Sequence, residues 1–340
     1  MKLAIVSTTI HGENGYLPFD RIAKESDFSE VTFVISGDKK SPDFNTKSFR
    51  CGIEYLSVKD QGKYKCSEHI GWNKIMRRNT ALLRAIEMQP DFILTIDDDN
   101  IPQSDYFDRW FKTITTPVDK TIISNDDKGS CCWHNYLKTS DADIEIYPRG
   151  FPIEFRGADS TKLVRANENI PNERIGFYQG ISLGDPDIDA ITRIVYPKPI
   201  SRIKDKGYCC KNIWSPYNTQ NTMFSKALFP LAFVWPDCGR YDDIYSSFVW
   251  QQFLFNNDMY VYVGEAVNVQ SRGKRNIIND LNNEFEGYSN AVSVWEAIRT
   301  IQETDALEFT RKLAESSNKI IKRQKKFVLA YLKDLVAVMP

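Results

Sequence analysis

The sequence predicts an α/β fold: a mixed, mostly parallel sheet with helices on both faces and a helical extension at the C-terminal end. Up to residue 102, apolar patterns follow the order strand, helix, strand, strand, helix, strand. Alternation of this kind is typical of a mostly parallel sheet covered by helices. From residue 292 almost to the end, the pattern is helical. We expect residues 1–288 to form the main domain and residues 289–340 a helical segment packed on it.

The most informative predicted strand is the apolar run 92–96, which leads directly into Asp97, Asp98 and Asp99. Ligands of open α/β sheets bind beyond the carboxyl ends of such buried strands. Three carboxylates at one place repel one another, and a hard cation such as Mg2+ or Mn2+ resolves that conflict. In strand geometry Asp97 and Asp99 point to the same side and could share one ion. The alternative is an acidic turn whose aspartates cap a helix.

Residues near this strand suit a nucleoside diphosphate. A helix predicted over residues 72–86 carries Arg77 and Arg78 near its start, and arginine pairs well with phosphate. The first two predicted strands end close to Thr8 and Asp38, which could contact a nucleoside. Ordinary turns also use such residues, so both interpretations of Thr8 and Asp38 stay open.

Composition limits the function. The formal net charge is −1 and the pI about 6.4, so nucleic acid is not an expected partner. The seven cysteines contain no CxxC motif, which argues against a zinc site and favours a reducing compartment. No apolar run is long enough for a signal peptide or a membrane span. These features predict a cytoplasmic location.

Three further clusters carry charged residues that suit catalysis. Arg149 lies in a loop with prolines on either side, where it could pair with phosphate or form a surface ion pair. Asp185 and Asp187 lie in a loop rich in Gly and Pro, where they could hold sugar hydroxyls or cap a helix. Asp242 and Asp243 begin a predicted helix, and one of them is our candidate general base. Capping that helix is the alternative.

Two polar segments and the basic C-terminal helix complete the candidates. Asn218, Gln220 and Asn221 could hydrogen-bond sugar hydroxyls or belong to an ordinary polar loop. A basic loop that contains Arg272 could close over a diphosphate. Residues 311–339 contain eight basic and two acidic residues. Such a helix either contacts the inner face of a membrane peripherally or packs on the protein with a solvated basic face.

Motifs over about residues 70 to 290 resemble two glycosyltransferase-related families. STELLO-type glycosyltransferases are resembled by the tracts Arg77-Arg78-Asn79, Asp97-Asp98-Asp99, Tyr178-Gln179-Gly180-Ile181 and Pro216 to Thr222. The reversibly glycosylated polypeptides, which are UDP-arabinopyranose mutases, are resembled by Arg149-Gly150-Phe151-Pro152, Pro186 to Ala190 and Gly239 to Asp243. The mutases carry a His-Ser-Lys tract where this chain has Gln270-Ser271-Arg272, a departure that leaves the third protein ligand of a metal open.

The resemblance implies a GT-A-like, Rossmann-like fold and a nucleotide-sugar donor, a UDP-sugar foremost. It implies an Mn2+ or Mg2+ ion held by Asp97 and Asp99, with Gln270 in the place of the third ligand. The implied activity is sugar transfer to a glycan or another hydroxyl acceptor. One alternative is a mutase that glycosylates itself at Arg149, and another is an inactive sugar-binding scaffold. A homo-oligomer is compatible with the sequence.

Overall fold

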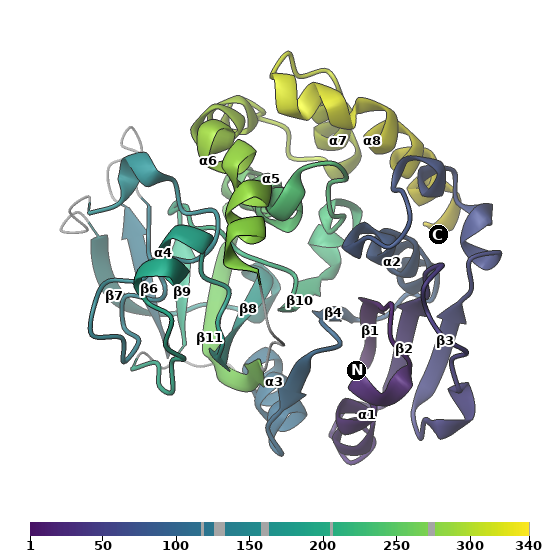
Figure 1. Ribbon diagram of the computed structural model, residues 1–340. Coiled ribbons are helices and arrows are strands. Elements are labelled where there is room, and N and C mark those ends of the chain that lie inside the picture. Colours follow the sequence, from purple (N-terminus) through teal and green to yellow (C-terminus); the bar gives the residue numbers. More distant parts are fainter. Residues whose placement is uncertain (117–118, 126–132, 158–162, 205–206, 271–275, 340) are drawn as a thin grey trace.

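The computed structural model describes residues 1–340 except 117–118, 126–132, 158–162, 205–206, 271–275 and 340. Its centre is an eleven-stranded sheet with the strand order β3-β2-β1-β4-β10-β8-β11-β9-β6-β7, and β5 pairs with β11 beside this path (Figure 1). The strands are β1 (Lys2–Thr8), β2 (Glu30–Ser36), β3 (Gly52–Leu56), β4 (Phe92–Ile96), β5 (Asn100–Pro102), β6 (Asp119–Asn125), β7 (Leu163–Asn169), β8 (Ile175–Gly184), β9 (Tyr208–Lys211), β10 (Asn221–Ser225) and β11 (Tyr260–Gln270). The α-helices are α1 (Leu17–Ala23), α2 (Arg78–Glu87), α3 (Tyr106–Thr115), α4 (Ala190–Val195), α5 (Asp242–Asn256), α6 (Ile277–Arg299), α7 (Ala306–Ala314) and α8 (Lys319–Val338).

The predicted mixed, mostly parallel sheet is confirmed. Strands β3, β2, β1 and β4 are parallel neighbours. Strand β10 runs antiparallel between β4 and β8, and β8 is parallel to β11. Following the pairings, β1, β2, β3, β4, β7, β8 and β11 share one direction and the other four strands run the opposite way. The carboxyl ends of β1, β2, β4, β8 and β11 therefore meet at one edge of the sheet.

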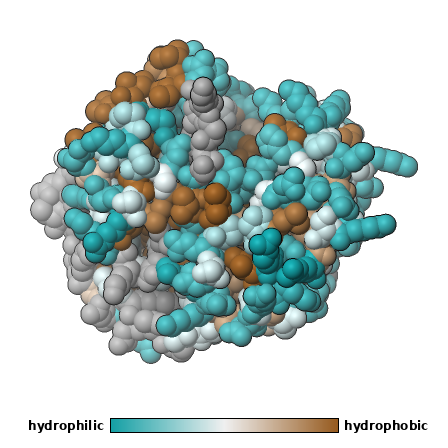
Figure 2. All heavy atoms as spheres, turned by 60° about the horizontal axis from the view of Figure 1, so that its bottom comes forward, coloured by the Kyte–Doolittle hydropathy of each residue, from teal (hydrophilic) through white to brown (hydrophobic). Residues whose placement is uncertain are grey.

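Two apolar cores explain why helices cover both faces. Leu3 and Ile5 of β1 pack in the core that contains apolar residues of α1 and α3. Ala4 and Val6, which alternate with them, pack in the core that contains residues of α2, α5, α6, α7 and α8. Alternate residues of a strand face opposite sides, so an almost uninterrupted apolar strand is the pattern that a doubly covered sheet requires. The outer surface in Figure 2 is accordingly mostly hydrophilic, with apolar patches scattered over it.

The C-terminal helices pack on the same body as the sheet. Helix α6 runs through the expected boundary at residue 288, so that boundary lies inside a helix. Helix α8 packs against α2 and against the short helix at residues 65–69. Its buried Asp334 carboxylate accepts the backbone N–H groups of Lys65, at 2.9 Å, and Cys66, at 2.7 Å. Within the described residues, no helix is both long and apolar enough to cross a bilayer.

The Asp334 bonds give a prediction for stability. Replacing Asp334 by Ala removes the acceptor of two N–H groups, one of them buried, and should lower the free energy of unfolding by about 1–3 kcal/mol. Asp334→Asn keeps one acceptor oxygen and should lose less. Urea unfolding followed by far-UV circular dichroism measures both values, and an Ala variant as stable as the parent would contradict this role.

Candidate active site

A buried ion pair fixes the first carboxylate beyond β4. The Arg78 guanidinium, at the start of α2, lies 2.5 Å from Asp97 Oδ1, and its side chain is only 3% exposed. The same group donates to the Ile96 carbonyl at 3.0 Å and to the Thr219 hydroxyl at 2.6 Å. A buried guanidinium is costly unless it is paired and hydrogen-bonded. Arg78 is therefore fully used in holding the end of β4 and the orientation of Asp97.

The next two aspartates have different surroundings. Asp98 accepts the hydroxyl of Thr9 at 2.6 Å. Burial raises the pKa of the Asp98 carboxyl, while this hydrogen bond lowers it. Asp99 is exposed, and its Oδ1 accepts the side-chain N–H of Gln270 at 3.2 Å. This contact forms because β5 pairs with β11 and places Asn100 opposite Gln270.

These residues fit a cation that is shared with a ligand. Asp97, Asp99 and Gln270 gather at one edge and offer carboxylate and amide oxygens, which hard divalent cations prefer. In the described part of the chain, no three His, Cys, Asp or Glu side chains are arranged to hold a metal by themselves. Mg2+ is usually bound by only one or two carboxylates together with substrate phosphates, so this donor set suits an ion that arrives with a diphosphate.

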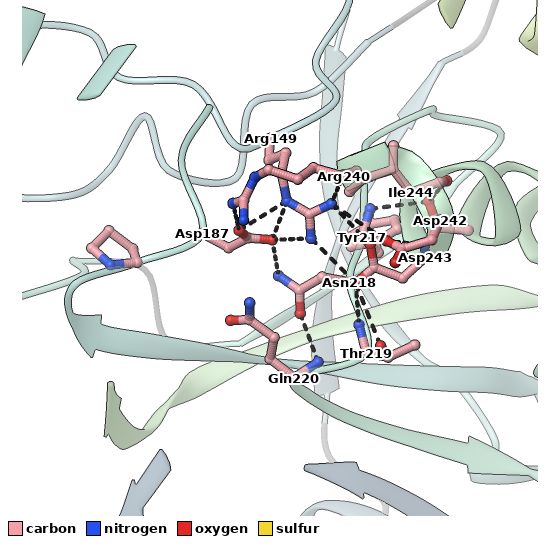
Figure 3. A network of polar contacts seen from close by, with 12 residues as sticks. Arg149, Asp187, Tyr217, Asn218, Thr219, Gln220, Arg240, Asp242, Asp243 and Ile244 are labelled. Carbon is pink, nitrogen blue, oxygen red and sulfur yellow. Dashed lines mark hydrogen bonds and ion pairs between the residues drawn. The ribbon is translucent and has the colours of Figure 1, made fainter. Parts of the chain in front are cut away.

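A second charged cluster surrounds Arg149 (Figure 3). Its Nε lies 3.0 Å from Asp187 Oδ1 and its Nη2 lies 2.8 Å from Asp187 Oδ2, a two-pronged contact. Its Nη1 lies 3.0 Å from Asp243 Oδ1 and also donates to the Arg240 carbonyl. The backbone supports this arrangement, because the Arg149 N–H donates to the Asp187 carbonyl at 2.9 Å. Arg149, Asp187 and Asp243 are all buried.

The carboxyl of Asp242 is the most perturbed acid of this cluster. Burial raises its pKa to about 8, and the neighbouring Asp243 charge adds to the shift, while Arg149 opposes it. Asp242 Oδ1 also accepts the backbone N–H of Asp243 at 2.9 Å. At neutral pH, Asp242 therefore keeps its proton.

Thr219 joins the two charged clusters into one network. Its hydroxyl accepts from Arg78, and its backbone N–H donates to Asp243 Oδ2 at 3.1 Å. Next to it, the Asn218 amide donates to Asp187 Oδ2 at 3.2 Å. Asp97 is thus connected through Arg78, Thr219 and Asp243 to Arg149 without leaving the protein interior.

A small polar cleft adjoins this network. It is lined by Asp187, Asn218, Gln220, Tyr136 and by residues 179–182 of β8. Its wall is continuous with the carboxylate edge, because the Gln220 carbonyl accepts from Asn100 at 2.6 Å. Asp242 and Asp243 lie behind Arg149 and are not among the residues that line this cleft. Of the acids in the second cluster, it is Asp187 that faces it.

Two predicted ligand contacts are used inside the protein instead. Arg77 donates to Gly71 O and to Ser67, and its guanidinium stacks on Trp72, 3.5 Å from the ring centroid. Asn221 is fully buried in β10, where it bonds the hydroxyl of Tyr106 and the amide of Asn268. These two side chains support the walls of the site and do not line its cleft.

Four further candidates lie at or near the same edge. Thr8 donates to the Ser36 carbonyl at 2.8 Å, and Asp38 caps the turn that follows β2. Asp185 pairs with Arg193, and its N–H donates to the Gln270 carbonyl at 3.0 Å. Arg272 lies outside the described residues.

Sequence patterns alone did not predict a role for Thr219 or Gln179. Thr219 is the bridge described above, and Gln179 accepts from Thr222 at 3.1 Å and lines the cleft. Only the density of amides and hydroxyls in residues 215–222 could have pointed to Thr219.

Neither protein-family models nor curated proteins give a match to this chain. Three solved structures show similarity. They are TarS 1–349 from S. aureus (12% identity, 99% of this chain and 91% of that chain, TM-score 0.38); the mannosyltransferase PcManGT from Pyrobaculum calidifontis with GDP-Man and Mn2+ (11%, 99% and 72%, TM-score 0.36); and glucosyl-3-phosphoglycerate synthase from Mycobacterium tuberculosis with Mn2+, UDP-glucose and phosphoglyceric acid (12%, 86% and 78%, TM-score 0.39). None of these three is named as a STELLO-type protein or a mutase. At such low TM-scores, the function of this chain has to be inferred from its own site.

The raised pKa of Asp242 gives a prediction for stability against pH. Between about pH 4 and the folded-state pKa of about 8, the folded chain holds this proton and the unfolded chain has lost it. Stability should therefore fall with rising pH across this window, by up to about 1.4 kcal/mol per pH unit, and level off above it. Asp242→Asn cannot ionise and should lack this slope.

Urea unfolding at several pH values between 5 and 8 compares the parent with Asp242→Asn. The exposed Asp108→Asn is the matched control and should keep the parent's slope. Parallel curves for the parent and Asp242→Asn would show that Asp242 ionises normally.

Proposed function

We propose that this chain is a metal-dependent glycosyltransferase that takes its sugar from a nucleoside diphosphate sugar, a UDP-sugar foremost. One observation carries the proposal: an edge with Asp97, Asp99 and Gln270 is continuous with the polar cleft lined by Asp187. Such a site combines groups for a cation and a diphosphate with groups that can hydrogen-bond sugar hydroxyls. It lies beyond the carboxyl ends of the strands, where ligands of open α/β sheets bind.

Asp97, Asp99 and Gln270 would hold Mn2+ or Mg2+ together with the donor diphosphate. The bound ion would stabilise the negative charge that develops on the leaving diphosphate. Arg78 keeps the Asp97 carboxylate oriented for this role, and because it is buried it need not reorganise when the donor binds. Gln270 contacts Asp99 already, so the amide that replaces the mutase histidine lies within reach of the same ion.

The acceptor would lie in the cleft beside Asp187. A carboxylate within hydrogen-bonding reach of an acceptor hydroxyl can take up its proton as a new glycosidic bond forms. Arg149 holds both oxygens of Asp187, which fixes the direction of the carboxylate. The assignment of Asp242 or Asp243 as the base stays a prediction. Asp242 keeps its proton at neutral pH, so it suits a proton donor better than a base there.

A mutase that glycosylates itself at Arg149 is the alternative function. Glycosylation needs a guanidinium nitrogen that the donor sugar can reach. Arg149 is 5% exposed, and all three of its side-chain nitrogens contact Asp187, Asp243 or the Arg240 carbonyl. This burial favours transfer to a separate acceptor. An inactive scaffold is distinguished from both only by a turnover assay. The cytoplasmic location and the absence of a nucleic-acid partner stay predictions.

The decisive experiment is a donor screen. The protein is incubated with a panel of nucleotide sugars, with Mn2+ or with a chelator, and nucleotides and protein are analysed by mass spectrometry. The transferase predicts metal-dependent release of a nucleoside diphosphate that speeds up when an acceptor is added. An isomerised donor, with a sugar mass added at Arg149, would establish the mutase. The absence of both turnover and donor binding would leave the scaffold.

Substitution of the carboxylates tests the metal site. Asp99→Asn removes an exposed ligand and should lower metal-dependent turnover by at least about 100-fold, since one lost charge-stabilising group costs ~3 kcal/mol of transition-state stabilisation. Isothermal calorimetry should show weaker Mn2+ binding in the presence of the nucleotide. Asp108→Asn, also exposed, should leave both unchanged. Full turnover by Asp99→Asn would remove Asp99 from the site.

A further inference from the structure

Helix α8 presents a row of lysines to solvent. Lys322, Lys325, Lys326 and Lys333 are exposed, and their spacing of three, four and seven residues places them on one face of the helix. The ion pairs of α7 and α8 within the described residues use other cations. The only acid of α8, Asp334, is buried against the backbone of residues 65–66. This face of α8 is therefore positive without an acidic side chain of its own.

A groove between α7 and α8 opens on this face and combines positive with apolar groups. Lys65, Lys325 and Lys333 contribute the cations of its lining, and Leu329 and Val336 are its exposed apolar residues. Leu329 is 37% and Val336 54% exposed, although the rest of the apolar surface of α8 is packed in the core. The groove and the lysine row lie at the outer end of the molecule that α7 and α8 form (Figure 1).

The combination of groups selects one kind of partner. A soluble phosphate would satisfy the lysines but leave Leu329 and Val336 in water. An anionic bilayer offers phosphate and carboxylate groups at its surface and apolar chains just below them. Lysine stems can lie along apolar surface while the ammonium groups stay at the level of the headgroups.

We propose that the α7–α8 face, with Lys65, Lys325, Lys333, Leu329 and Val336, docks the protein on the anionic surface of a lipid bilayer. The surface is formed entirely by residues outside the site proposed for sugar transfer. It is nevertheless linked rigidly to that site: Asp334 holds residues 65–66, and Ser67 next to them bonds Arg77 at the start of α2. Docking would thus bring the carboxylate edge to a defined position relative to the membrane.

Vesicle flotation of the full chain tests the proposal. Vesicles are made of phosphatidylcholine alone or with phosphatidylserine. We expect binding only to the vesicles that contain phosphatidylserine, weakening as salt rises. Lys325→Glu with Lys333→Glu should lower the partition coefficient at least about tenfold, because each lysine near such a surface adds appreciably to binding. The matched control, Lys24→Glu with Lys47→Glu, makes the same change in net charge at exposed positions of other segments and should change binding less than about twofold.

A second variant tests the apolar part. Leu329→Ser with Val336→Ser keeps every lysine and should also lower binding to phosphatidylserine vesicles, with the largest relative loss at high salt. Thermal unfolding checks that all variants fold, and turnover without vesicles should be the same in each. Equal binding to both kinds of vesicle, equal loss in the control pair, or release of the protein from vesicles by inorganic phosphate would each overturn the proposal.

Discussion

Two arginines without access to water determine how this molecule is built around its site. A guanidinium group remains charged at any pH at which the protein is folded, so burying one is tolerated only when acceptors surround it. Arg78 and Arg149 recruit these acceptors from distant parts of the chain: the end of β4, the loop after β8, the segment before β10 and the start of α5. Thr219 lies between the two arginines and serves both. The network therefore fixes the relative positions of four connections that carry acids, as a site with several charged groups requires.

The topology of the sheet explains why these connections converge. Strands β1, β2 and β4 end at the same edge as β8 and β11, while β10 enters between β4 and β8 in the opposite direction. Because β10 is antiparallel, it is the segment before the strand, and not after it, that arrives at this edge. Asn218, Thr219 and Gln220 lie there for this reason. A glycine of β8 allows the close approach, since a Cβ at Gly180 would lie 2.2 Å from the side-chain nitrogen of Asn221.

The sequence predicted the parts of the fold that depend on local patterns. The order of elements through β4 and the acidic edge at residues 97–99 both come from continuous apolar runs and from the polar residues directly after them. The fates of Arg77 and Arg78 could not be predicted, because neighbours on a helix point about 100° apart and tertiary packing decides which one meets the site. Likewise, the acids at the start of α5 matched a motif, but nothing local shows that Arg149 would stand between them and the cleft. Helix α6 crosses the expected domain boundary because its apolar pattern begins among polar residues near its first turns.

The bond between Asp334 and Lys65 spans 269 residues of chain. Contacts so distant in sequence form late, because the intervening chain must already be folded before its ends can meet. During synthesis, the N-terminal strands leave the ribosome long before α8 is made. The segment at residues 65–69 then has no partner for its backbone groups, and Arg77 has no fixed platform on which to stack. The last helix of the chain thus acts as a completion signal: the edge that holds the acidic site becomes rigid only when the entire polypeptide has been made.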